Sequence, residues 1–152
     1  MFRKVILALM CCVVMASGEA LHIGAVKGML EHAKKTVNQI DVETLKSMID
    51  KKEKFYLVDL RGNAHLERGE IYTTNLLRIE RGYLEFKIEK VVPDKNARIV
   101  LYCCSGIRSI LAAESLMKMG YKNVSSLKGG IAEWTDKDFP LDVTFGEVAT
   151  KH

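Results

Sequence analysis

The stretch VLYCCSGIRS, residues 100–109, decides the fold, because a short apolar run ends there in a tight polar loop and a helix follows. Arg98 to Tyr102 is rich in β-branched and aromatic residues, which predicts a buried strand. Ser109 to Met119 carries apolar residues at helical spacing and stops at Gly120, which predicts a helix. Cys103 therefore lies between a strand and a helix. At the carboxyl edge of a parallel sheet this is where ligands bind and where unpaired N–H groups meet an anion.

A thiolate is such an anion. The N–H groups of this loop and the guanidinium of Arg108 are expected to favour the ionised sulfur of Cys103. An ionised cysteine is a strong nucleophile, so the sequence makes Cys103 the candidate for covalent catalysis.

The run of Cys103, four further residues, Arg108 and Ser109 resembles the active loop of the rhodanese family, in which the first cysteine carries a persulfide. The likeness extends to four other segments, which are Leu57–Arg61, Arg81–Phe86, Met119–Val124 and Leu127–Trp134. Together they cover about residues 40–140, the size of one compact domain. The resemblance implies an α/β fold of rhodanese type, with a five-stranded, mainly parallel sheet flanked by helices on both faces.

The sequence places four strands and several helices within this frame. The strands are expected at Phe55–Asp59, Leu76–Ile79, Arg98–Tyr102 and Asn123–Leu127. Asp41 is expected to cap a helix that turns Leu45, Met48 and Ile49 inward, and short helices are expected at Tyr83–Lys90 and Ile131–Trp134. Trp134 is expected to pack in the core.

Asp59 and Arg61 lie at the end of the strand expected at Phe55–Asp59, on the sheet edge that also carries Cys103. In the rhodanese family the matching Asp and Arg hold this edge together, which makes them candidate support residues linked by charge-assisted hydrogen bonds. The segment from Asn63 to Ile79 departs from the family, because its stretch Gly69–Asn75 lacks the His and Pro that relatives often have there. The shape that this wall of the site has in the family is therefore not expected in this chain.

Residues 1–20 have the pattern of a secretory signal peptide, with Arg3 and Lys4 before an apolar run and small residues after it. An uncleaved membrane anchor is the alternative, but the run from Val5 to Ala16 is shorter than the roughly 20 residues that a span needs. The mature protein is thus expected in the periplasm or outside the cell, with no stable membrane span.

Residues 21–39 are predicted to form an N-terminal amphipathic helix, because apolar residues recur there at intervals of three and four. Packing across the domain is the expected role, and docking a partner or lying on a membrane surface are the alternatives. Residues 40–140 form the predicted domain, and residues 141–152 are a polar tail with no assigned role.

Cysteine, histidine and charge content exclude several classes of function. Of four cysteines, Cys11 and Cys12 leave with the signal, so the adjacent pair Cys103 and Cys104 cannot build a disulfide framework. The four histidines are scattered without metal-ligand spacing, and no metal or other cofactor is expected. The net charge of +4 falls to +3 when Arg3, Lys4 and Glu19 leave with the signal, a mild bias that suits a small anionic substrate and is too weak for a nucleic-acid surface.

The resemblance and the loop chemistry together predict a sulfurtransferase. It would move sulfane sulfur from thiosulfate or polysulfide to a thiol or cyanide-like acceptor, free or on a partner protein, through a persulfide on Cys103. The candidate substrate-binding residues, whose N–H groups and one guanidinium would hold the persulfide anion, are Cys104, Ser105, Gly106, Ile107, Arg108 and Ser109.

Three alternatives remain open at this point. Cysteine phosphatases and arsenate reductases close a similar loop with one more intervening residue than the four found here. Cys104 stands where the family commonly has a polar or basic residue, so the Cys103–Cys104 pair is also a candidate for dithiol redox or soft-metal binding. The third alternative is a non-catalytic binding module that keeps only the fold.

Overall fold

The computed structural model describes residues 24–66 and 68–143. The chain falls into two compact units, residues 1–32 and residues 33–152, which are described separately. In the first unit, residues 24–32 are helical, and the side chains of Val26 and Met29 are exposed. The predicted signal peptide lies outside the described residues.

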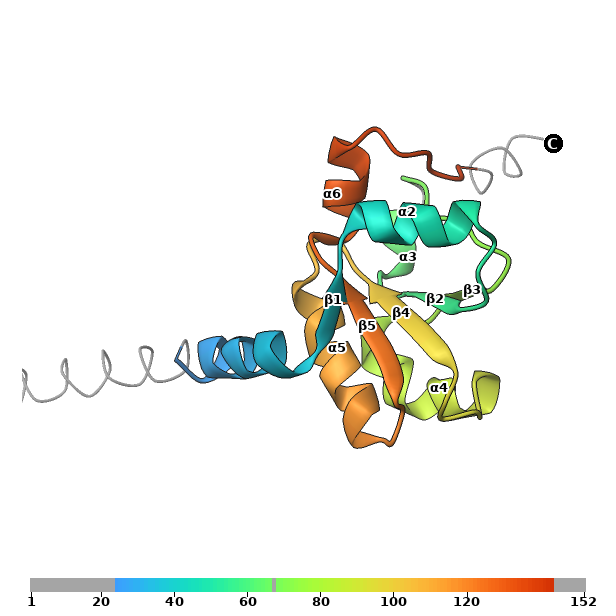
Figure 1. Ribbon diagram of the computed structural model, residues 1–152. Helices are drawn as coiled ribbons and strands as arrows, with labels where there is room; N and C mark the ends of the chain where they lie inside the picture. Colours follow the sequence, from blue (N-terminus) through green and yellow to red (C-terminus); the bar gives the residue numbers. More distant parts are fainter. Residues whose placement is uncertain (1–23, 67, 144–152) are drawn as a thin grey trace, which may run out of the picture. The chain divides into compact units, whose positions relative to one another are not determined.

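The second unit contains a five-stranded sheet in the order β1-β5-β4-β2-β3, and every neighbouring pair is parallel (Figure 1). The strands are β1 Asn38–Ile40, β2 Tyr56–Asp59, β3 Leu76–Arg78, β4 Arg98–Tyr102 and β5 Asn123–Leu127. The fold class predicted from the sequence is confirmed. The strand β4 lies at the centre of this order, between β5 and β2, and its apolar residues from Ile99 to Tyr102 are all buried, as in a parallel strand covered on both faces.

Helices cover both faces of this sheet. The helices α2 (Val42–Asp50) and α6 (Gly130–Asp136) bury Leu45 and Trp134 in a cluster with strand residues that include Val100 and Tyr102. The helices α4 (Leu84–Val91) and α5 (Ile107–Lys118) lie on the opposite face, where α5 packs on β4 and β5. Figure 1 shows α2 and α6 on one side of the strands and α4 and α5 on the other.

The start of α2 follows the sequence prediction. The Asp41 side chain accepts a hydrogen bond of 2.7 Å from the Thr44 backbone N–H, which satisfies one of the unpaired donors of the first turn. Leu45 and Met48 are buried below it. The predicted burial of Trp134 is also confirmed, since its side chain is buried and its Nε1–H donates to the Pro140 carbonyl over 3.0 Å.

The predicted helix over residues 21–39 is wrong at its carboxyl end. Residues 24–36 are helical, but Asn38–Ile40 form strand β1, which pairs with Ser125–Leu127 of β5. The apolar spacing around Ala33 and Val37 fits a helix as well as an extended chain. Pairing with β5 decides between them, because a partner strand supplies hydrogen bonds that local spacing cannot reveal.

The other differences concern the bounds of helices. The helix α5 begins at Ile107 instead of Ser109, and α6 runs from Gly130 to Asp136. The predicted helix at Tyr83–Lys90 is a 3₁₀ turn at Arg81–Tyr83 followed by α4, and a short helix α3, Asn63–Leu66, was not anticipated. Within residues 24–66 and 68–143, no helix combines the length and the apolar character that crossing a membrane requires.

Candidate active site

Cys103 follows directly on the last residue of β4, at the carboxyl edge of the sheet, and α5 begins four residues later. The intervening loop turns sharply at Gly106, whose φ of 86° is a left-handed conformation that favours glycine. Cys103 is 1% exposed, whereas Cys104 is partly exposed. The first turn of α5 leaves its N–H groups without partners inside the helix, so they are available at this edge.

The loop is clamped by the start of α6. The backbone N–H groups of Ile131 and Ala132 donate to the carbonyls of Cys103 and Cys104 over 2.9 and 3.0 Å. Gly130 must be glycine there, because its φ is +61° and a Cβ would lie 2.7 Å from the Cys104 carbonyl oxygen and closer still to that of Cys103. The two hydrogen bonds from α6 therefore fix the backbone of both cysteines.

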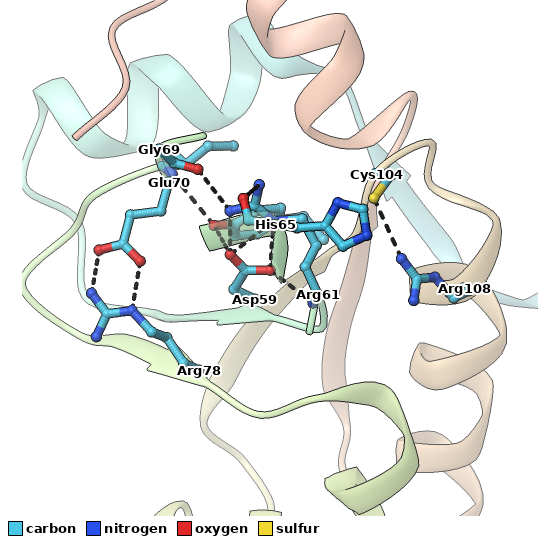
Figure 2. A network of polar contacts seen from close by, with 10 residues as sticks. Asp59, Arg61, His65, Gly69, Glu70, Arg78, Cys104 and Arg108 are labelled. Atoms are coloured by element: carbon cyan, nitrogen blue, oxygen red, sulfur yellow. Dashed lines mark hydrogen bonds and ion pairs between the residues drawn. The ribbon is translucent and has the colours of Figure 1, made fainter. Parts of the chain in front are cut away.

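The two sulfurs face different surroundings. The Cys103 thiol is directed at the buried Ser109 hydroxyl, with 3.8 Å between Sγ and Oγ. The exposed guanidinium of Arg108 donates from Nη2 to Cys104 Sγ over 3.4 Å, a contact drawn in Figure 2. The sequence predicts that Arg108 stabilises the ionised sulfur of Cys103, whereas in the structure it contacts Cys104. The difference arises because Arg108 and Cys104 lie on the outer side of the loop, while Cys103 continues the buried strand.

The predicted substrate-binding residues lie together around the Cys103–Ser109 loop and the first turn of α5. The side chains of Ser105, Ile107 and Arg108 are exposed, whereas that of Ser109 is fully buried. Across the described ranges, no three His, Cys, Asp or Glu side chains lie close enough together to hold a metal ion.

The predicted support residues Asp59 and Arg61 form a buried pair beside β4. Asp59 is fully buried and accepts hydrogen bonds from Arg61 Nη2 over 2.7 Å, from Arg61 Nε over 3.0 Å and from the Tyr102 hydroxyl over 2.6 Å. Parallel pairing places Asp59 opposite Tyr102, the residue before Cys103. The network therefore ties the end of β2 to the end of the strand that carries the cysteine.

Burial and the pair determine the charge states in this network. Burial by itself lowers the pKa of the Arg61 guanidinium, but the hydrogen bonds and charge of Asp59 outweigh it and raise that pKa above its usual value. Burial, followed by the neighbouring Asp59 charge, raises the pKa of the Tyr102 hydroxyl far above its usual value. Tyr102 therefore remains a hydrogen-bond donor to Asp59 at every physiological pH.

Arg61 also holds in place the wall of the site between Asn63 and Ile79, for which the family resemblance predicted no shape. Its Nη2 donates to the Gly69 carbonyl over 2.9 Å, and its Nη1 donates to the His65 carbonyl over 3.3 Å. Next to them Glu70, which is 3% exposed, pairs with Arg78 of β3. Figure 2 shows both ion pairs, Asp59 with Arg61 and Glu70 with Arg78. The two carbonyls bound by Arg61 thus fix the position of this wall.

The family model for the rhodanese-like domain matches residues 41–137. The chain belongs to the rhodanese-like family. Its sequence is 33% identical over 105 residues to a sulfurtransferase of Allochromatium vinosum. The aligned residues cover 69% of this chain and 94% of that protein. It is 31% identical to the thiosulfate sulfurtransferase GlpE of Haemophilus influenzae, over 59% of this chain and 81% of GlpE.

A solved structure from Rhodopseudomonas palustris shares this rhodanese-like fold, with a TM-score of 0.71 and 28% sequence identity. The match covers 77% of this chain and 93% of that protein, which is described as a protein of unknown function and a possible tyrosine phosphatase.

Two residues of the rhodanese-like site were not singled out from the sequence. Tyr102 could have been found from strand register, because Asp59 and Tyr102 each end an apolar run at the same sheet edge. Ser126 of β5, whose Oγ lies 2.9 Å from that of Ser109, carries no such signal. A serine within a strand is ordinary, and only the packing of α5 on β5 brings the two hydroxyls together.

Proposed function

We propose that this protein is a sulfurtransferase that carries sulfane sulfur as a persulfide on Cys103. The observation that carries the proposal is the position of Cys103, at the carboxyl end of β4 and at the start of α5, in a loop whose backbone α6 holds in place. Sulfurtransferase relatives that align with most of their own length support the same chemistry.

The first step is a displacement at sulfur. The Cys103 thiolate attacks the outer sulfur of thiosulfate, or a sulfur of a polysulfide. The new bond joins Sγ to that sulfur, and the S–S bond of the donor breaks with its electron pair on the leaving anion, which is sulfite when thiosulfate is the donor. Charge is conserved, because a thiolate and a dianion give a persulfide anion and sulfite. No general acid is needed, since the leaving group is already a stable anion.

The second step returns the enzyme to its thiolate form. A thiolate or cyanide-like acceptor attacks the outer sulfur of the persulfide, and the electron pair of the S–S bond returns to Sγ of Cys103. The N–H groups from Cys104 to Ser109 would stabilise the terminal anion between the two steps, as an oxyanion hole does. The exposed Arg108 guanidinium adds positive charge at the outer side of this loop, where an anionic donor approaches.

The test is the intact mass of the purified protein after brief incubation with thiosulfate or with polysulfide, with and without a reductant. We expect a reductant-sensitive gain of one sulfur atom in the wild type and none in Cys103→Ser. Arg108→Ala should gain the same sulfur about tenfold more slowly at low donor concentration, since it loses a charge-assisted contact to the donor. Persulfide formation in Cys103→Ser would contradict the proposal.

Other outcomes would point to the alternatives. The contact between Arg108 and Cys104 favours a second candidate, a dithiol pair, which would appear as a loss of two hydrogens that Cys104→Ser abolishes. Turnover of an aryl phosphate without sulfur uptake would indicate a phosphatase. If none of these reactions occurred, the result would indicate a non-catalytic binding module.

We also propose that the reaction takes place in the periplasm or outside the cell, after removal of residues 1–20. The charged start, apolar run and small residues of that segment support export. N-terminal sequencing of the protein recovered from cell fractions tests this, and recovery of the protein from the cytosol with Met1 intact would contradict it.

A further inference from the structure

Two buried serine hydroxyls lie beneath Cys103. Ser109 stands in the first turn of α5 and Ser126 in β5, and both are fully buried. Their Oγ atoms are 2.9 Å apart, and Ser109 Oγ is 3.8 Å from Cys103 Sγ. Ser126 pairs in the sheet with Leu101, two residues before the cysteine. The hydroxyls and the sulfur therefore form a short chain that water does not reach.

The direction of each hydrogen bond follows from the partners. Ser109 Oγ donates to the Gly106 carbonyl over 3.1 Å, which uses its single proton. The bond between the two serines must then be donated by Ser126. In the thiol form, Ser109 Oγ accepts from both Cys103 S–H and Ser126 O–H.

Ionisation of Cys103 changes the direction of one bond. When the thiol proton leaves for solvent, the Ser109 hydroxyl can rotate from the Gly106 carbonyl to the sulfur anion. The Gly106 carbonyl keeps a partner, because the Ile110 backbone N–H also donates to it over 3.1 Å. Ser126 donates to Ser109 Oγ in both states. A hydrogen bond to a thiolate is charge-assisted and stronger than the bond to a carbonyl that it replaces.

We propose that Ser126 is a positioning residue for sulfur transfer, which holds the Ser109 hydroxyl where it can donate to the Cys103 thiolate. The proposal rests on the proposed function, in which charge lies on Sγ before the first step and again after the second. By donating to Ser109 Oγ, Ser126 also polarises the Ser109 hydroxyl toward the sulfur. Two buried hydroxyls that served packing alone would have no such connection to the reacting atom.

The elements that meet at the Cys103 loop carry other ionisable groups, which must be held constant in a test. They are Cys104 on the loop, Arg108 on α5, Tyr102 on β4, Asp59 on β2, Arg61 just after β2 and Glu133 on α6. Substitutions at Ser126 leave all of these groups in place. Cys104 is replaced by serine in every variant that is compared, so its absence is the same throughout.

The experiment measures the rate of Cys103 alkylation against pH in the full chain carrying Cys104→Ser. Tryptic cleavage after Arg98 and Arg108 then gives a peptide in which Cys103 is the one thiol, so the modification is counted at that site. We expect Ser126→Ala to move the midpoint of the profile to higher pH, with about threefold less thiolate at a given pH below the midpoint. Ser109→Ala should lower the thiolate about tenfold.

Ser125→Ala is the matched control. It removes the same atom from the same strand, but the Ser125 hydroxyl lies on the other face of β5 and accepts from Asn38. Its midpoint should equal that of the parent. Ser126→Thr, which keeps a hydroxyl, should restore the midpoint. The midpoint is independent of how easily the reagent reaches the sulfur, so a partly loosened variant still gives an answer.

A Ser126→Ala profile that coincides with the Ser125→Ala profile would overturn the proposal. So would a shift that Ser126→Thr fails to reverse. Failure of the proposed function has a different signature, in which the wild type takes up no sulfur from thiosulfate or polysulfide while the alkylation profiles are still measured.

Discussion

Asp59 and Arg61 show how one buried ion pair connects two strand ends and a loop. Arg61 is 4% exposed, yet its guanidinium reaches the Asp59 carboxylate, the Gly69 carbonyl and the His65 carbonyl. The Asp59 charge is satisfied from two sides, by Arg61 and by the Tyr102 hydroxyl. At the scale of the residue, the pair is an anchor for the wall of the site, and Tyr102, which donates to Asp59, is the residue before Cys103.

Arg61→Ala should destabilise the fold by about 3–5 kcal/mol, because it leaves the Asp59 carboxylate buried without a cation. Chemical denaturation measures the loss. Arg98→Ala is the control, since the Arg98–Glu53 pair is 47% and 35% exposed and should contribute about 1 kcal/mol or less. Equal losses in the two variants would show that the buried pair has no special role.

The bend before α6 is the feature that matters at the scale of secondary structure elements. Gly129 and Gly130 both have positive φ, and they bring the first N–H groups of α6 against the carbonyls of Cys103 and Cys104. The sequence predicts a flexible bend at Gly129 and Gly130. The structure shows a tight bend, because the Cys103–Ser109 loop packs directly against it.

Gly130→Ala should slow persulfide formation by up to about a hundredfold, because its Cβ displaces the loop that presents the nucleophile. The initial rate of sulfur uptake measures this. Gly120→Ala is the control that separates displacement of the Cys103 loop from backbone strain. Gly120 also has a positive φ, of +93°, but nothing lies near its Cβ position. Gly120→Ala should therefore lower stability by about 1–2 kcal/mol and leave the rate unchanged. Similar rates in the two variants would contradict the role of the bend.

At the scale of the whole molecule, buried tyrosines link stability to pH. Tyr102 is fully buried, and Tyr121 is 2% exposed with its hydroxyl donating to the Val92 carbonyl over 2.7 Å. Burial is the main cause that raises the pKa of both hydroxyls. The folded chain therefore keeps phenol protons at an alkaline pH where the unfolded chain, with tyrosine pKa values near 10, releases them.

The stability contributed by the Tyr102 proton should be complete below about pH 10 and should fall as pH rises further, by up to about 1.4 kcal/mol per pH unit. The sign follows because the unfolded state binds fewer protons than the folded state in this range. Tyr102→Phe should be less stable at neutral pH, having lost the bond to Asp59, but should show a shallower alkaline decline. Denaturation curves at several alkaline pH values test this, and equal slopes would exclude Tyr102 as the source.

The sequence by itself determined what local patterns encode. The central strands, the cap at Asp41 and the place of Cys103 between β4 and α5 follow from runs of apolar residues and from the residues that end them. The resemblance to the rhodanese family also predicted that Asp59 and Arg61 hold this sheet edge together, and the two form a buried ion pair there.

The tertiary structure decided everything that depends on partners distant in the chain. The strand β1 exists because β5 pairs with it, and Arg108 meets Cys104 because the buried strand turns Cys103 inward. The Ser109–Ser126 contact arises only where α5 packs on β5. Sequence spacing records the period of a single element, whereas these contacts depend on how the elements pack against one another.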